Sequence, residues 1–121
     1  MNYQSIKNKN QPSKFLANLF FKNNLPLKSV FKKHSQWLAL LRHCRIHGVE
    51  GLVLESSHRQ WAIITVEGHI VRYTLFDHLG IFGFDVFLKP EDCLKYLFER
   101  GYRAVAPSDT FKKCSNLWSI N

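Results

Sequence analysis

Apolar residues recur at steps of three and four up to about residue 47, and at steps of two after Gly51. The longer step is typical of an amphipathic helix and the shorter one of a strand with one buried face. Residues 1–11 are polar and show neither period. The pattern therefore predicts a loose tail, then helices, then a sheet.

Two helical segments are predicted before Gly48. The first follows Pro12 and carries Phe15, Leu16, Leu19 and Phe20, and it ends in the break at residues 22–26. The second runs from about Leu27 to His47. Ser35 could cap a separate helix, so this region could be one helix or two with a kink. Its apolar stripe consists of Val30, His34, Trp37, Leu40, Leu41 and Cys44.

Strands are predicted at residues 51–57, 60–66, 69–75 and 81–88, with a short fifth at 103–107. A hairpin turn at Glu67-Gly68 would set Ile64 opposite Val71 and Ala62 opposite Tyr73. Gly80 and Gly83 fit a bulge or turn better than a phosphate-binding loop. In the fourth strand one face is predicted to hold Phe82, Phe84, Val86 and Leu88.

The segment 89–103 predicts a helix that opens at Pro90, has acids in its first turn and stops at Gly101. Its buried stripe would be Leu94, Leu97 and Phe98. The pattern after residue 107 is ambiguous, although Leu117 and Trp118 suggest that the segment docks on the body.

This order of elements predicts an α+β fold. N-terminal helices would precede a four- to five-stranded, mainly antiparallel meander, with one C-terminal helix packed on it and the helices on one face. Residues 1–11 would be a flexible basic tail. Residues 12–121 would form a single domain, with a basic helical part at 12–48 and a sheet-helix part at 49–121.

Charge is distributed unevenly along the 121 residues. The net charge is +8, yet residues 1–49 hold nine Lys or Arg and no Asp or Glu. Residues 50–121 hold eight basic and nine acidic residues, a net of −1. Repulsion among unrelieved cations favours a partner that supplies negative charge: nucleic acid, an acidic protein or an anionic membrane. The competing interpretation is a solvated, solubilising face.

The polyanion hypothesis names the side chains that could reach a partner. Most lie off the apolar stripe, so phosphates could be contacted along the helices. Aromatics on the sheet such as Trp61, Tyr73, Phe82 and Phe84 could stack with bases, but core packing is their more common use. The candidate binding residues are Lys14, Lys22, Lys28, Lys32, Lys33, Arg42, His43, Arg45 and His47.

The stretch "RHCRIHG", Arg42–Gly48, also raises the question of a metal. His43 and His47 are four apart and would lie on one helix face. Zinc needs three or four ligands, and no spacing supplies the others. Cations in a last helical turn and a glycine after it are explained by helix termination alone. We therefore expect no metal and no other cofactor.

Catalytic arrangements are weak. Ser56, Ser57 and His58 are adjacent but lack a nucleophile elbow. Cys93 is predicted near a helix start, beside acids that disfavour a thiolate. Asp77, His78 and Asp85 could act as acid and base, but turn formation is the commoner role of such residues. We expect a protein that is not an enzyme.

Cellular location is predicted from the three cysteines and the lack of long apolar runs. Cys44, Cys93 and Cys114 match no disulfide or zinc spacing, which favours reduced thiols in a cytoplasmic protein. No run is long enough to cross a bilayer, and the short run at 15–21 lacks a signal-peptide pattern. Contact of Phe15–Phe20 with a membrane surface is a weaker possibility.

Two functions follow from this sequence. The first is a small, non-catalytic basic protein that binds DNA or RNA through its N-terminal helices. The alternative is an inhibitor, immunity or accessory factor that docks on an acidic surface of a larger protein.

Overall fold

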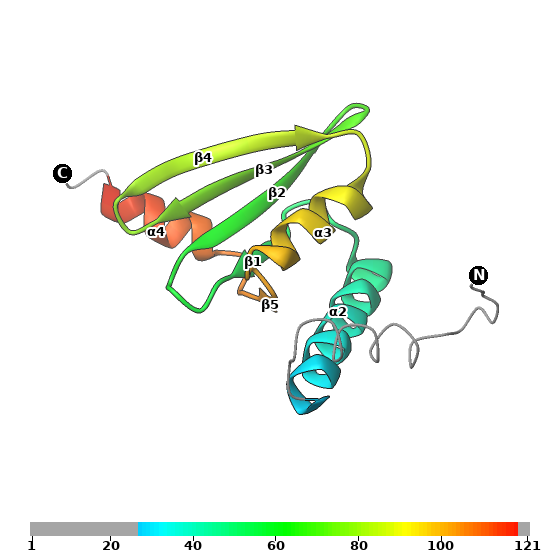
Figure 1. Cartoon of the computed structure of the whole chain (residues 1–121). Coiled ribbons are helices and arrows are strands. Elements are labelled where there is room, and N and C mark those ends of the chain that lie inside the picture. Colours follow the sequence, from blue (N-terminus) through cyan, green and yellow to red (C-terminus); the bar gives the residue numbers. More distant parts are fainter. Residues whose placement is uncertain (1–26, 119–121) are drawn as a thin grey trace. The chain divides into compact units, whose positions relative to one another are not determined.

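The computed structural model describes residues 27–118, and their side chains from Ser29 onward (Figure 1). Three helices and a five-stranded sheet are present in this range, so the α+β prediction is confirmed. In chain order the elements are α2 (Leu27–His47), β1 (Val53–Glu55), β2 (Trp61–Glu67), β3 (Ile70–Asp77), β4 (Gly80–Phe87), α3 (Pro90–Glu99), β5 (Ala104–Val105) and α4 (Thr110–Trp118).

Helix α2 has the predicted bounds and is continuous through Ser35, so the two-helix alternative is wrong. The helix contains no Gly or Pro that would interrupt its hydrogen bonds. It ends at Gly48, whose φ is 79° and whose N–H donates to the Cys44 carbonyl at 2.8 Å. The first predicted helix, and the tail before it, lie outside the described residues.

Backbone contacts divide the chain between Leu38 and Ala39, inside α2. The last turns of α2, the whole sheet, α3 and α4 belong to the part from Ala39 onward. Within the described residues, no helix combines the length and apolar character needed to cross a membrane.

The sheet is antiparallel throughout, with strand order β4-β3-β2-β1-β5. The β2–β3 hairpin pairs Glu67 with Ile70 and Ile64 with Tyr73. The predicted register was therefore wrong by two residues. Gly68 stands first in the two-residue loop with a φ of 63°, a conformation that glycine adopts easily. A slip of two keeps every side chain on its predicted face.

Strand β4 contains the bulge that its glycines suggested. Gly83 pairs with Leu75, while Ile81 pairs with Phe76, so Phe82 is the extra residue. The bulge interrupts the alternation. The predicted set was therefore wrong: Ile81, Phe84 and Val86 share a face, and Leu88 lies beyond the end of the strand.

The two C-terminal helices lie on opposite faces of the sheet, so the prediction of one helical face is wrong. Tyr96 of α3 stacks on Tyr73 with ring centroids 5.6 Å apart. Phe111 of α4 meets Phe76 at 4.9 Å. Tyr73 and Phe76 are three residues apart on one strand and therefore point to opposite faces. The segment that the sequence left ambiguous is thus a second covering helix.

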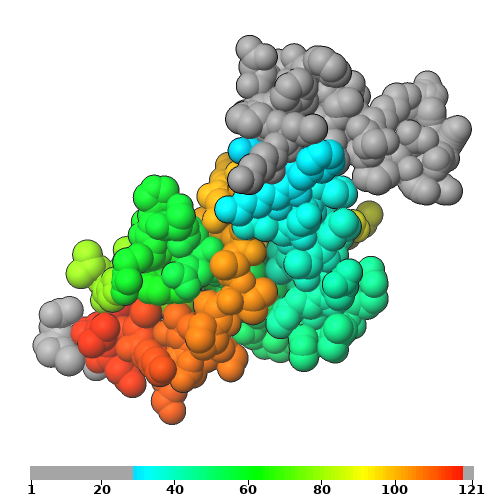
Figure 2. All heavy atoms as spheres, turned by 90° about the horizontal axis from the view of Figure 1, so that it is seen from below, coloured from blue at the N-terminus to red at the C-terminus, as the bar shows by residue number. Residues whose placement is uncertain are grey.

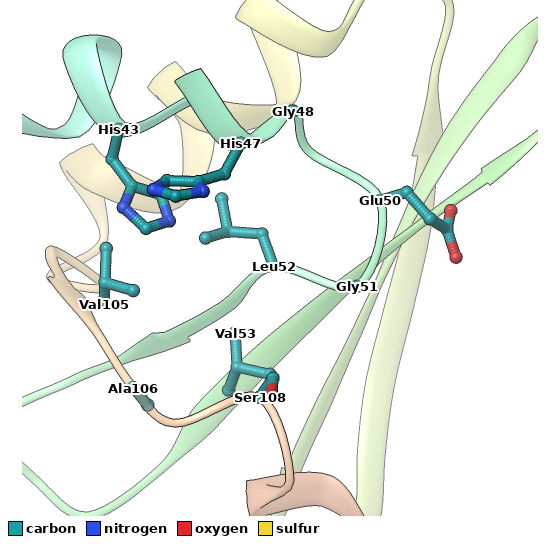
Figure 3. A pocket seen from close by; sticks show the side chains of 10 residues that line it. All are labelled: His43, His47, Gly48, Glu50, Gly51, Leu52, Val53, Val105, Ala106 and Ser108. Carbon is teal, nitrogen blue, oxygen red and sulfur yellow. The ribbon is translucent and has the colours of Figure 1, made fainter. Parts of the chain in front are cut away.

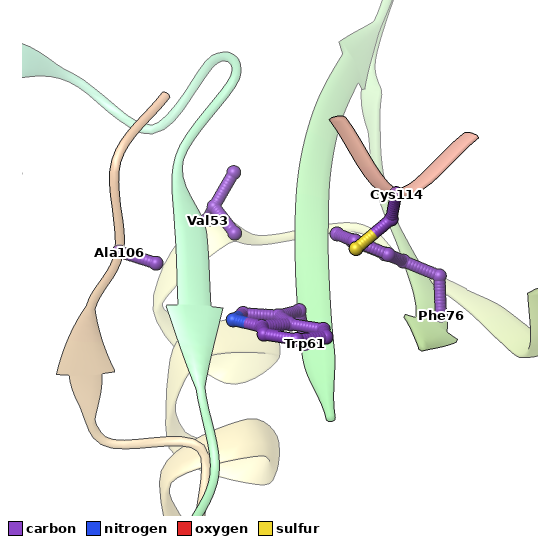
Figure 4. Close-up of a cluster of buried hydrophobic side chains, with 5 residues drawn as sticks. All are labelled: Val53, Trp61, Phe76, Ala106 and Cys114. Carbon is purple, nitrogen blue, oxygen red and sulfur yellow. The ribbon is translucent and has the colours of Figure 1, made fainter. Parts of the chain in front are cut away.

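Each face has its own core. Beneath α4 the buried cluster joins Val53, Trp61, Phe76, Ala106 and Cys114 (Figure 4). The chain from β5 into α4 forms one continuous surface over this side, orange to red in Figure 2. On the α3 face the fully buried side chains are Leu54, Ala62, Ile64, Cys93 and Leu97. The predicted stripe of α3 is confirmed, since Leu94, Leu97 and Phe98 are all buried.

Candidate polyanion-binding surface

The last turns of α2 present two arginines to solvent. Arg42 and Arg45 are both exposed. At 100° per residue Arg42 and Arg45 lie about 60° apart around the helix. Both side chains therefore project from one side of it. Their position near the helix end is favourable, because the exposed carbonyls there carry partial negative charge.

His43 and His47 lie on another side of the same turns. Their ring centroids are 4.6 Å apart, and Figure 3 shows the two imidazoles close together. Both rings border a hollow of about 280 Å³. We call Arg42, His43, Arg45 and His47 the basic helix end.

The hollow beside the histidines is built by segments far apart in sequence. Leu52 and Val53 line it from the start of β1, and Val105 and Ser108 line it from β5 and the segment after it. Its volume is below the roughly 300–1,000 Å³ typical of pockets that enclose small ligands. It can therefore admit a group of a larger ligand rather than surround a whole molecule.

Glu50 is the one acid that borders this hollow, and it is directed elsewhere. Its side chain points away from the histidines in Figure 3. Its Oε1 accepts a hydrogen bond from the Val66 N–H at 2.6 Å. The carboxylate therefore caps a backbone donor on β2 and does not neutralise the basic helix end.

The arginines of the basic helix end have no acidic partner among residues 27–118. The ion pairs in that range are Arg72–Glu67 at 3.0 Å and Lys113–Asp109 at 3.4 Å. Helix α2 itself contains no Asp or Glu. The positive charge on this helix is therefore available to solvent or to a binding partner.

The structure brings together four of the nine predicted binding residues, those of the basic helix end. Lys32 is exposed and Lys33 half-buried in the earlier part of α2, where Lys28 also lies in the first turn. Lys14 and Lys22 fall outside the described residues. Sequence reasoning missed Val105 and Ser108, because no pattern in a single sequence indicates which distant loop contacts a helix end.

Of the candidate catalytic groups, Asp77 has a structural role and Cys93 is buried. Asp77 Oδ1 accepts the N–H groups of Leu79 and Gly80 at 2.8 and 3.2 Å, which is turn formation. Burial, with a further contribution from Asp85, raises the pKa of the Cys93 thiol to about 12, so it is not a thiolate near neutrality. Ser57 Oγ and His58 Nδ1 are 3.3 Å apart but exposed.

Among the described residues, no three His, Cys, Asp or Glu side chains gather as a metal site. Cys44 lies beside His43 in the chain, and burial raises the pKa of its thiol, which disfavours the thiolate that a metal requires. The three cysteines are free thiols.

No family model, curated protein or solved structure matches this chain.

Proposed function

We propose that this chain is a small, non-catalytic protein that binds DNA or RNA through basic side chains of its N-terminal helical part. The observation that carries the proposal is the pair Arg42 and Arg45, exposed and without an acidic partner among the described residues. Phosphates are the anions that such side chains contact, and each contact releases condensed counterions.

The placement of these side chains on two sides of the helix end favours a polymer over a single small anion. Arg42 and Arg45 project from one side of the helix end, while His43 and His47 border the adjacent hollow. Contacts of this kind hold a sugar-phosphate backbone without reading base edges, so little sequence preference is expected. Lys28, Lys32 and Lys33 lie earlier on α2 and would add contacts to the same kind of ligand. The proposal takes the cytoplasm as the compartment, where nucleic acid is present and free thiols are stable.

Fluorescence anisotropy with labelled random DNA and RNA at 50 and 200 mM salt tests this proposal. The wild-type chain should lose on the order of tenfold or more in affinity between the two salt concentrations. The variant R42Q/R45Q should lose about tenfold at 50 mM, with a salt slope shallower by about two, one for each lost phosphate contact.

The matched control is K95Q/K112Q, which removes the same charge from exposed positions on α3 and α4. It should bind almost as the wild type does, and melting curves of both variants should show an intact fold. If the two variants lose affinity equally, net charge alone drives binding and the site is wrong. If the wild type binds neither nucleic acid at 50 mM salt, the proposal fails and an acidic protein surface becomes the partner to test.

A further inference from the structure

Strand β4 is an outer strand whose side chains are unusually apolar and exposed. It pairs with β3 on one side and with no other described strand on the other. Phe84 is 67% exposed, although it lies in the middle of the strand. Together with the residues that flank the strand, the exposed apolar set is Leu79, Ile81, Phe82, Phe84, Val86 and Leu88.

The opposite edge of the sheet, strand β5, is less suited to pairing with a new strand. Strand β5 is only two residues long, Ala104–Val105, and a short outer strand offers few groups to a new partner. Strand β4 spans eight residues and contains no Lys or Pro, the residues that commonly protect a sheet edge. The free edge of β4 is therefore the place where another strand could add to the sheet.

The free edge already has one of its donors occupied. Asp85 Oδ1 accepts the N–H of its neighbour Val86 at 2.8 Å. Since alternate residues of an outer strand direct their backbone groups outward, Phe84 and Val86 share this orientation. Asp85 thus covers the Val86 donor, while the Phe84 N–H and carbonyl are the next outward pair.

We propose that the free edge of β4 pairs with β4 of a second copy of this chain, antiparallel, about a two-fold axis at Phe84. The sheet would then continue across the two copies. An isologous contact of this kind requires a self-complementary surface, and a mostly apolar strand with one central aromatic provides it. Phe84 would face its own counterpart, which forms an aromatic cross-strand pair.

Charge disfavours an axis one residue away and is compatible with a second copy as the occupant. With the axis at Phe84, each Asp85 lies opposite Gly83 of the second copy, whereas an axis at Asp85 would oppose two carboxylates. Arg72, whose guanidinium lies 5.7 Å from the Phe84 ring, is already paired with Glu67. Residues 50–121 carry a net charge of only −1, so like surfaces from two copies do not repel strongly. A polyanion or a charged protein would find little to pair with here.

Sedimentation velocity over a range of about 10–300 µM tests the proposal, because a single strand pair is a small interface and should dissociate in the tens of micromolar. The mass should rise from 14.2 kDa toward twice that value with concentration. Phe84→Glu should weaken the dimer at least tenfold. Asp85→Ala should strengthen it several-fold, because it frees the Val86 donor.

The matched control is Ile46→Glu, since Ile46 is 68% exposed and lies on α2 rather than β4. It should leave the dimer unchanged. A wild type that stays monomeric at about 300 µM overturns the proposal and leaves a strand of another protein as the occupant to test. A dimer that Phe84→Glu does not weaken overturns it too, since association would then occur elsewhere.

A cross-link fixes the register independently. In a Cys44→Ser background, Phe84→Cys should form a disulfide-linked dimer on mild oxidation. Residues opposite each other in a hydrogen-bonded antiparallel pair have Cα atoms about 5.5 Å apart, within the range a disulfide spans. Ile46→Cys in the same background should stay monomeric. Equal cross-linking of the two variants would mean random collision and would contradict the register.

Discussion

The basic helix end and strand β4 are both exposed, but they expose opposite kinds of atoms. Arg42 and Arg45 offer charge with no acidic partner among the described residues, so what binds there should be sensitive to salt. Phe84 and its neighbours offer apolar area and unpaired backbone groups, so association there should change little with salt. Under the two proposals, one small chain separates two kinds of recognition, and a variant should remove each without the other.

The largest effect should come from the core on which both surfaces depend. Phe76 is fully buried, and Phe76→Ala should cost about 3–5 kcal/mol of unfolding free energy through lost burial and a cavity. Phe84→Ala, on the neighbouring strand, removes the same atoms from an exposed position and should cost less than about 1 kcal/mol. Urea unfolding at a concentration where the chain is monomeric measures both. Equal losses would mean that Phe84 is buried in solution.

Alkaline pH should lower the stability of the protein while leaving the arginines charged. Burial raises the pKa of the Cys93 thiol from 9.0 to about 12 and also raises the pKa of Cys114 and Tyr102. Between pH 9 and 12 the unfolded chain has therefore lost protons that the folded chain keeps, so stability falls as pH rises. For Cys93 the slope should approach about 1.4 kcal/mol per pH unit.

Urea midpoints measured from pH 8 to 11 test this expectation, and Cys93→Ala should flatten the dependence. The half-exposed Cys44 provides the control, because Cys44→Ala should flatten it less. A stability that does not change up to pH 11 would contradict the burial of these groups.

A charge-reversal variant tests the basic residues of α2 without changing strand β4. The substitution K28E/K32E/K33E reverses three charges in the earlier part of α2 and should lower affinity for nucleic acid at least tenfold, about 1.4 kcal/mol. Dimerisation through β4 should be unaffected. K89E/K95E/K112E changes the net charge equally at exposed positions and is the anisotropy control. If K28E/K32E/K33E binds normally, the basic charge there serves only solubility.

The smallest effect concerns how α2 ends. Gly48 has a φ of 79°, where an L-residue is strained, and apart from its two chain neighbours no atom lies within 4 Å of an added Cβ. Gly48→Ala should therefore cost about 1 kcal/mol from backbone conformation alone. Gly48→Asn should cost less, because asparagine tolerates this region. Thermal unfolding compares them, and an Ala variant as stable as the wild type would be inconsistent with this helix end.

The hydrophobic pattern predicted most of the local structure. The bounds of α2 followed from its helical period and from Gly48, and those of α3 from Pro90, its first-turn acids and Gly101. The two glycines of β4 indicated a bulge or a turn, and the strand contains a bulge. Such features depend on backbone conformation and on neighbours in the chain, which sequence reports directly.

Features that depend on distant residues were predicted poorly. The hairpin register was wrong by two residues, because both registers bury the same faces and the pattern cannot separate them. The hollow beside His43 and His47 includes Val105 and Ser108, which nothing in their own sequence marks. The exposure of Phe84 could not be predicted either. An alternating apolar pattern is the same whether the face of the sheet is covered or open.

By itself, the sequence determined the α+β class, the elements before residue 107 and the separation of nine unrelieved cations from a nearly neutral remainder. Period and charge are properties of the chain that no folding step can alter. Only the tertiary structure decided that α3 and α4 cover opposite faces, and that Phe84 in the middle of β4 stays exposed. Burial depends on which distant segments meet, so the exposed edge exists only once the helices have packed.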